Sequence, residues 1–369
     1  MAKYRNHICL ISHQNTPELL GGLMPGPEKP KMHAIVTPEM KEEADRFRKT
    51  CLSLGLECEL YELPRVAEIE RVLDEIWLKG EAETWATNIT GGTKIMAIAA
   101  YGWAIRNKLP AFYVDTAERR ILFNEGEGWK ETPLPKLVEY ETLMNLHGYA
   151  INEKSEASID RESRIAIDSL LARVASNPDP FHIINRAAFM ASEDPFLTVS
   201  CFIDSEFKKL LGALKNANKL DFTDRYIRFN SRDALSWCQG LWLEEYVASV
   251  LDKLKKGGLI NSWTSNVKID KAGYNELDAV FTANNRLHVI ECKTSKMKNK
   301  GEASILYKAD SIRGRLAGIF TQSLICSVDE LSPASDARAK EMNIRVLSGA
   351  NLKNLRKFII NWIGKNERN

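Results

Sequence analysis

The sequence predicts an α/β protein with two sheet-containing units separated by a helical middle segment. Short strand-like stretches alternate with helix-like stretches through the first 140 residues, and the same alternation returns from about residue 226. The stretch between them has helical patterns only, broken by the proline-bearing segments NPDPF and EDPF. Because a chain of 369 residues is long for one core, we expect three parts, at residues 1–145, 146–225 and 226–369.

The composition is that of an ordinary globular protein, with 44% hydrophobic and 27% charged residues. Its net charge is only +2, so a local basic patch would have to hold any polyanion. No apolar run approaches the roughly 20 residues that cross a bilayer, and MAKYRNHICLIS lacks the features of a signal peptide. The seven cysteines form no C-x-x-C pair, which argues against a zinc ribbon or a disulfide framework. We expect a cytoplasmic protein without membrane contact.

The first unit is predicted as a mostly parallel, Rossmann-like sheet covered on both faces. Its strand-like runs are residues 7–12, 33–37, 56–61, 84–90 and 111–115. Residues 38–55 and 65–80 have apolar side chains at i, i+3 and i+4, as amphipathic helices do. Residues 117–132 predict a hairpin that turns at Asn124 to Gly128.

The middle segment shows no residues with evident chemistry. Helical patterns cover residues 161–177 and 206–217. We interpret it as a small helical or winged-helix module that serves as a spacer or a dimer surface.

The last unit begins with a strong helix at residues 237–258, which ends at Gly257 and Gly258. Strand patterns follow at 262–269, 276–283 and 286–294, and two further helix-strand pairs complete the unit.

One strand of this unit, HVIECKTSK (288–296), carries Glu291 and Lys293 on the same face. Asp278 precedes Glu291 by 13 residues, and a hairpin that turns at 283–285 would bring the two acids together. On the preceding helix Glu244 borders the apolar stripe, whereas Glu245 falls on the outer face.

Acids that converge in this way repel each other unless a divalent cation lies between them. Oxygen ligands suit Mg²⁺ or Mn²⁺, so we expect Asp278, Glu291 and Glu244 to hold one of these metals. A metal at this place would activate a water molecule and stabilise the charge on a phosphodiester under attack. Lys293 would orient that water or neutralise the transition state.

The pattern E…D…E-x-K, with Gly240 to Glu244 as G-x-x-x-E, resembles the PD-(D/E)xK, or restriction-endonuclease-like, nucleases. Leu277 stands where the family name has proline, but the carboxylate of Asp278 is retained. The resemblance implies a metal-dependent nuclease and a supporting catalytic role for Lys308. The basic residues after the strand predict either a track for a nucleic-acid backbone or a solvated face: Lys296, Lys298, Lys300, Lys308, Arg313 and Arg315.

In the first unit, the segment NITGGTKIMAIAAYGWA (88–104) predicts a strand end, a glycine-rich turn and a helix start. Such a turn either forms an anion site or is a purely structural helix entry, and this one is neither a P-loop nor a dinucleotide fingerprint. Other polar residues would gather at the same edge of the sheet, because the carboxyl ends of parallel strands meet there: Ser12, Gln14, Asn15, Thr37 and Asp115.

A sheet with T-G-G-T-K followed by a PD-(D/E)xK unit resembles the CARF-domain nucleases of type III CRISPR systems. That resemblance implies an N-terminal CARF domain that binds a cyclic oligoadenylate, most often cyclic tetraadenylate, across the axis of a homodimer. It further implies that the ligand activates cleavage of RNA, DNA or both in antiviral defence. Thr90, Gly91, Gly92, Thr93 and Lys94 match the ligand loop of the family, and Ser12, Gln14 and Asn15 match its N-terminal loop.

Two other functions stay open. The chain can be a messenger-sensing regulator that binds nucleic acid with an inert nuclease fold, although the presence of all four charged positions, Glu244, Asp278, Glu291 and Lys293, argues against it. The N-terminal domain can also degrade its messenger, although no nucleophile or base is evident beside Lys94. The sequence leaves open whether single-stranded RNA, single-stranded DNA or plasmid DNA is the substrate, whether duplex is nicked or cut, the number of metals and the size of the activating ring.

Overall fold

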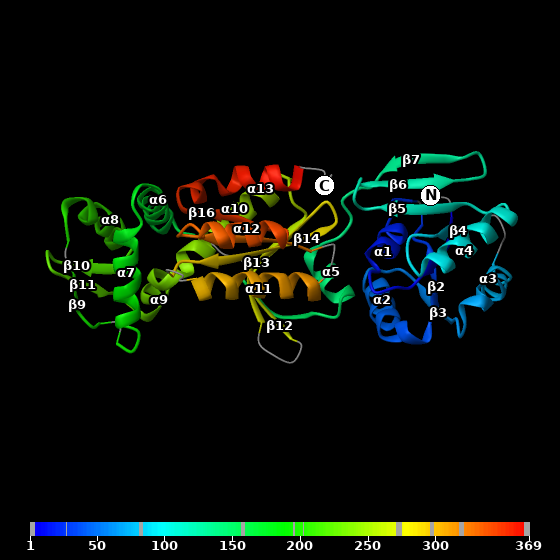
Figure 1. The fold of residues 1–369 in the computed structure, drawn as a ribbon, viewed down its shortest axis with the longest axis horizontal. Coiled ribbons are helices and arrows are strands. Elements are labelled where there is room, and N and C mark those ends of the chain that lie inside the picture. The colour runs from blue at the N-terminus through cyan, green and yellow to red at the C-terminus, as the bar shows by residue number, and fades with distance from the viewer. Residues whose placement is uncertain are drawn as a thin grey trace.

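The computed structural model describes residues 4–26, 28–80, 84–155, 159–194, 196–201, 203–270, 275–295, 299–316 and 321–364. Three units follow one another along the long axis of the molecule (Figure 1). The N-terminal sheet lies at one end, a second large sheet lies in the centre, and a small sheet with three helices lies at the other end.

The N-terminal unit has a seven-stranded sheet in the order β3-β2-β1-β4-β5-β6-β7. Its first five strands are parallel and the last two add an antiparallel hairpin, so the predicted Rossmann-like sheet and hairpin are confirmed. The strands are β1 (Asn6–Leu10), β2 (Lys31–Val36), β3 (Cys58–Glu62), β4 (Trp85–Asn88), β5 (Ala111–Asp115), β6 (Arg120–Asn124) and β7 (Trp129–Pro133).

Helices cover both faces of this sheet, because side chains alternate along each strand. Ile8 and Leu10 pack with helices α3 and α4, whereas Cys9 and Ile11 share a core with α1, α2 and α5. The helices are α1 (Thr16–Gly22), α2 (Lys41–Ser53), α3 (Ile69–Trp77), α4 (Lys94–Arg106) and α5 (Tyr140–Leu146), with short 3₁₀ turns at Pro38–Met40 and Val66–Glu68.

The middle segment is a compact module in which the described residues form three helices and a small sheet, whose strands the sequence analysis did not locate. Its helices are α6 (Arg161–Ser176), α7 (Asp179–Met190) and α8 (Ser205–Asn216), and its strands are β9 (Val199–Ser200), β10 (Leu220–Phe222) and β11 (Tyr226–Phe229). The strands are antiparallel in the order β10-β11-β9. Ile227 and Phe229 are buried with the helices, so the module extends past residue 225, where we placed its end.

The central unit has a six-stranded sheet in the order β16-β15-β14-β13-β12-β8. Its strands are β8 (Ala150–Ser155), β12 (Ser262–Asp270), β13 (Asn275–Ala283), β14 (Arg286–Lys293), β15 (Thr321–Ser327) and β16 (Ile344–Ser348). The assignment of residues 146–225 to a helical segment is therefore wrong for β8, which pairs with β12 at the edge of this sheet.

Helices also cover both faces of the central sheet. Helices α10 and α13 share a core with Ala279 and Ile290, whereas α11 and α12 pack against Ile325 on the other face. The helices are α9 (Arg232–Ser236), α10 (Trp242–Lys256), α11 (Asn299–Leu316), α12 (Pro333–Glu341) and α13 (Leu355–Gly364), with a 3₁₀ turn at Gly349–Asn354. The helix expected at 237–258 begins instead as a π-helical turn, η4 (Trp237–Leu241), with a non-helical Gly240.

The turn between β13 and β14 contacts the linker that leaves the N-terminal unit. The side chain of Asn285 accepts a hydrogen bond from the Leu137 N–H at 2.7 Å and donates one to the Pro135 carbonyl at 2.7 Å. In the described part of the chain no helix is long and apolar enough to cross a membrane. A cytoplasmic location stays a prediction.

Candidate functional site

The hairpin of β13 and β14 brings two acids together at its open end. Ala279 pairs with Ile290, a register that places Asp278 opposite Glu291. One Asp278 carboxylate oxygen accepts a hydrogen bond from the Cys292 N–H at 2.6 Å. Asn284 and Asn285 form the turn with positive φ angles of 53° and 60°, which suits asparagine and fixes this register.

Two lysines hold the Glu291 carboxylate, which is only 4% exposed. Lys293 Nζ lies 3.1 Å from Glu291 Oε1, and Lys308 Nζ of α11 lies 2.6 Å from the same oxygen. The predicted shared face of Glu291 and Lys293 is thus present, and α11 brings Lys308 into direct contact with the acid.

Glu244 completes the acidic cluster from the first turn of α10. Burial, followed by the negative charges of Asp278 and Glu276, raises its pKa to about 8. Burial followed by the charge of Glu291 raises the pKa of Asp278 to about 6. Glu245 instead accepts a hydrogen bond from the Trp237 indole N–H at 2.7 Å. The structure therefore brings Glu244, rather than Glu245, near the hairpin acids.

Glu276 is an acid of this cluster that the sequence analysis missed. It is exposed and stands two residues before Asp278 on β13, so the alternation of the strand places both on one face. The same period-two rule that paired Glu291 with Lys293 would have found it.

The acidic cluster has the chemistry of a site for a hard divalent cation. All its ligands would be carboxylate oxygens. Burial and then mutual repulsion raise the pKa values of Glu244 and Asp278, and a bound cation would remove that repulsion. In the residues that the structure describes, however, no three acidic, histidine or cysteine side chains converge closely enough to hold a metal as they stand.

The predicted basic track has little support in the described residues. Lys296 and Lys298 lie outside them, as do the side chains of Lys300 and Arg315. Lys308 is paired with Glu291, and Arg313 is paired with Asp310 at 2.7 Å.

The glycine-rich loop lies at the carboxyl edge of the N-terminal sheet, against the end of β1. A Cβ atom at Gly91 would overlap both the Leu10 carbonyl oxygen and the Glu18 carboxylate, so only glycine fits there. Gly92 has a φ of 72°, a conformation that favours glycine. The buried Asn88 accepts hydrogen bonds from the Thr90 N–H at 3.0 Å and the Thr90 hydroxyl at 2.6 Å.

Among the described residues, the side chains of Thr90 and Thr93 make hydrogen bonds within the domain, whereas that of Lys94 does not. The Thr90 hydroxyl also accepts a hydrogen bond from the Val114 N–H at 2.8 Å, and the Thr93 hydroxyl caps α4 through the Met96 N–H at 3.3 Å. Lys94, the first residue of α4, is exposed at the helix N-terminus. The loop thus has a fixed backbone, and its exposed residues are Thr93 and Lys94.

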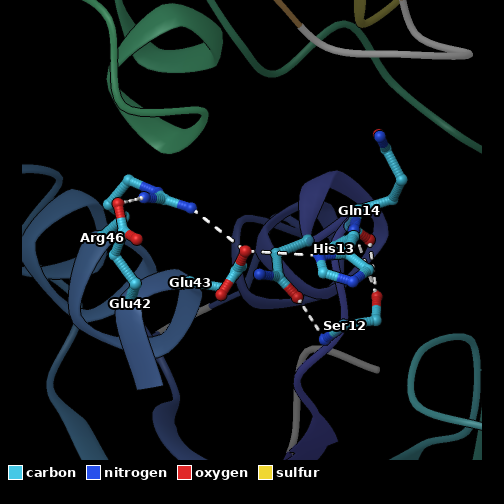
Figure 2. Close-up of polar contacts among 7 residues, drawn as sticks. Ser12, His13, Gln14, Glu42, Glu43 and Arg46 are labelled. Atoms are coloured by element: carbon cyan, nitrogen blue, oxygen red, sulfur yellow. Dashed lines mark hydrogen bonds and ion pairs between the residues drawn. The ribbon is translucent and has the colours of Figure 1, made fainter. Parts of the chain in front are cut away.

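The segment after β1 forms a second fixed loop, drawn in Figure 2. The Ser12 N–H donates to Asn15 Oδ1 at 2.9 Å, and the Ser12 hydroxyl donates to the Gln14 carbonyl at 3.2 Å. His13 Nδ1 lies 3.2 Å from Glu43 of α2, whereas the Gln14 side chain extends away from that helix (Figure 2). Because Gly91 and Gly92 pack against Leu10, the two loops meet at the end of β1.

The remaining two predicted crevice residues lie at strand ends. Thr37 precedes the 3₁₀ turn at Pro38–Met40, and β2 is the parallel neighbour of β1. Asp115 accepts a hydrogen bond from the Glu118 N–H at 3.1 Å and pairs with Arg120 at 3.2 Å, so its carboxylate stabilises the β5–β6 hairpin. A ligand role for either residue stays a prediction.

The fold and the two sites define a class of protein: a Rossmann-like sensor domain joined to a PD-(D/E)xK nuclease domain. Residues 6–141 match the family described as the Card1 CARF domain, and residues 231–366 match the Card1-like endonuclease domain. The chain therefore belongs with the Card1-like CARF nucleases. No curated protein matches the chain.

Solved structures of similar architecture extend over nearly the whole chain. Can2 from Sulfobacillus thermosulfidooxidans, solved in complex with cyclic tetra-adenylate, is 27% identical, covers 98% of each chain and has a TM-score of 0.83. The protein VC1899 from Vibrio cholerae shares the fold, with 19% identity, a TM-score of 0.85 and coverage of 98% of this chain and 99% of that chain. A type III CRISPR defence DNA nuclease activated by cyclic oligoadenylate has 20% identity and a TM-score of 0.53, over 88% of this chain and 45% of that chain.

Proposed function

We propose that this chain is a nuclease activated by a cyclic oligoadenylate, specifically cyclic tetraadenylate, in type III CRISPR antiviral defence. The similarity to Can2, which was solved with that ligand and aligns over 98% of each chain, carries the proposal. The acidic cluster with its two lysines supports catalysis, since an inert fold has no need to bury Glu291 beside Asp278.

The nuclease reaction would use Mg²⁺ or Mn²⁺, held by Asp278 and Glu291 with Glu244 as the third acid. The metal would supply charge stabilisation and an activated water. Lys293 and Lys308 would then neutralise the charge that develops on the phosphate, as preorganised cations do in a site of restricted solvation. We propose single-stranded RNA, single-stranded DNA or plasmid DNA as the substrate.

The messenger would bind at the two loops beside the end of β1. Its phosphates would bind at the N-terminus of α4, where backbone N–H groups and Lys94 attract anions. Ser12, Gln14 and Asn15 would form the facing wall, and Thr37 and Asp115 would lie at the rim.

A second copy of the chain would complete the messenger site. Helix α4, which starts at the ligand loop, exposes isoleucines on its outer face: Ile95 at 69%, Ile98 at 71% and Ile105 at 39% exposure. Such a stripe is typical of a helix that packs on a partner. A symmetric ligand also matches an isologous dimer, so we propose a homodimer through α4.

Two substitutions separate catalysis from sensing. Glu291→Gln should lower messenger-stimulated cleavage at least about 100-fold while messenger binding persists, because it removes a metal ligand and the partner of both lysines. Lys94→Ala should weaken messenger binding instead. Glu341→Gln, on the exposed end of α12, is the matched control and should change neither quantity.

The alternative of an inert regulator is tested by the same set of proteins. If the wild type binds the messenger but cleaves no substrate with either metal, the nuclease proposal is wrong. If Glu291→Gln cleaves as fast as the wild type, the acidic cluster is not the active site.

A further inference from the structure

The peptide group of Gln239 joins the middle module to the end of β14, the strand that carries Glu291 and Lys293. Its carbonyl oxygen accepts a hydrogen bond from Asn185 Nδ2 of α7 at 2.6 Å and another from Thr294 Oγ1 at 2.9 Å. Both donors are buried, with 6% and 8% exposure. A carbonyl oxygen has two lone pairs, so two side chains from separate elements can bind it at once.

The local backbone makes this arrangement possible. Gln239 lies within the π-helical turn η4, and turns of this kind inside helices occur frequently at functional sites. A Cβ atom at Gly240 would lie 2.7 Å from Thr294 Oγ1, so glycine is what allows the two segments to approach. The glycine that opens the G-x-x-x-E motif thus has a packing role.

The junction lies beside two catalytic candidates. Thr294 directly follows Lys293, whose own carbonyl accepts a hydrogen bond from the Val328 N–H at 2.9 Å. Glu244 follows Gly240 by one helical turn, at the start of α10. The bonds to Gln239 therefore fix the backbone next to the catalytic lysine and the entry of the helix that carries the third acid.

Helix α7 contacts this end of the sheet at two further points. Gln239 Nε2 donates to the Ala188 carbonyl at 3.2 Å, and His182 Nε2 lies 2.8 Å from Asp329, just beyond β15. Figure 1 shows α7 between the small sheet of the module and the central sheet. The module thus attaches where β14 ends.

We propose that Asn185 is a positioning residue for the nuclease reaction, and that the module acts through it as a support for the active site. Asn185 holds the Gln239 carbonyl in the place where Thr294 can reach it, and Thr294 in turn fixes Lys293. This inference rests on the proposed nuclease function. It gives the middle module a part in catalysis beyond that of a spacer.

The effect should fall on kcat, because a lysine that is displaced by about 1 Å misses the transition state, and such misplacements cost up to about 100-fold in rate. Substrate binding along the rest of the surface should persist, so KM should stay within about twofold. Asn185→Asp keeps the shape of the side chain but replaces the N–H donor with an oxygen. Thr294→Val removes only the hydroxyl, and Thr294→Ser restores it.

The test measures kcat and KM on labelled single-stranded RNA and DNA with Mn²⁺ and saturating cyclic tetraadenylate, together with thermal stability and messenger affinity, for the full-length chain. We expect Asn185→Asp and Thr294→Val to lower kcat at least about tenfold with KM and messenger affinity unchanged, and Thr294→Ser to keep most of the activity. Ser169→Ala, which removes a hydroxyl bonded to Ile165 within helix α6, is the control and should match the wild type.

The double variant Asn185→Asp with Thr294→Val adds a second criterion. Both donors act on one oxygen, so its loss in kcat should be smaller than the product of the two single losses. Wild-type kcat in Asn185→Asp and Thr294→Val would overturn this inference alone, as would a loss that Thr294→Ser does not reverse. If Asn185→Asp fails to fold, the comparison of Thr294→Val with Thr294→Ser decides. A wild type without any cleavage would overturn the proposed function and this inference with it.

Discussion

Glu18 makes the stability of the sensor domain depend on pH. This glutamate of α1 is fully buried behind the glycine-rich loop, and burial raises the pKa of its carboxyl to about 8. The nearby backbone N–H groups of Glu18 and Gly91 offset part of this rise in pKa. Among the described residues, however, neither carboxyl oxygen has a partner that meets the distance and angle limits of a hydrogen bond. The folded domain therefore holds a neutral carboxylic acid at neutral pH.

The sign of the effect follows from proton linkage. Between pH 4.5 and pH 8 the folded state keeps a proton that the unfolded state has lost, so stability falls as pH rises through this window. From pH 6 to pH 8 the loss from this one group amounts to about 2 kcal/mol. For a domain of this size that corresponds to a decrease in Tm of about 4–8 °C.

Glu18→Gln removes the titration while keeping a neutral side chain of the same shape. We expect the Tm of its sensor domain to fall less between pH 6 and pH 8 than the Tm of the wild type does, by about 4–8 °C. Thermal unfolding of the full chain at both pH values measures it, and the comparison cancels the contributions of other titrating groups. Glu57→Gln, at an exposed position, should behave as the wild type does. Equal pH slopes for the wild type and Glu18→Gln would refute the neutral buried acid.

Three further predictions concern sensing, coupling and assembly. Gly91→Ala should abolish messenger binding in calorimetry, since its Cβ would overlap the Leu10 carbonyl oxygen. Gly212→Ala, with open space around it, should bind normally. Messenger binding by Gly91→Ala would contradict the fixed loop. Asn285→Gly keeps the left-handed turn but loses the three side-chain hydrogen bonds to the linker. Messenger affinity should therefore persist while the stimulation of cleavage falls several-fold, and undiminished stimulation would exclude this turn as a coupling point. Ile98→Glu should convert the proposed dimer to a monomer in light scattering, and a dimer that persists in this variant would place the interface elsewhere.

The periodicity of single strands and helices predicted much of the fold and the acidic cluster. The alternation in β14 placed Glu291 and Lys293 on one face, and the short turn before the strand set the register that brings Asp278 opposite Glu291. These features are local, so a short stretch of sequence determines them.

Features that depend on contacts between distant segments were not predictable in this way. Strand β8 looked like part of a helical segment because its partner β12 comes more than a hundred residues later. The apolar periodicity of residues 237–258 continues through Gly240, so the pattern hid the π-helical turn. Glu18 lies in a stretch for which the sequence analysis predicted no element, and its burial depends on packing with distant segments such as the glycine-rich loop at Gly91.

The most direct test of the account incubates the protein with labelled single-stranded RNA, single-stranded DNA and supercoiled plasmid. Each substrate is tested with Mg²⁺ or Mn²⁺ or with a chelator, and with or without cyclic tetraadenylate. The account predicts cleavage only when messenger and metal are both present. Cleavage that is independent of the messenger would contradict the sensor function, and messenger binding without cleavage of any substrate would contradict the nuclease function.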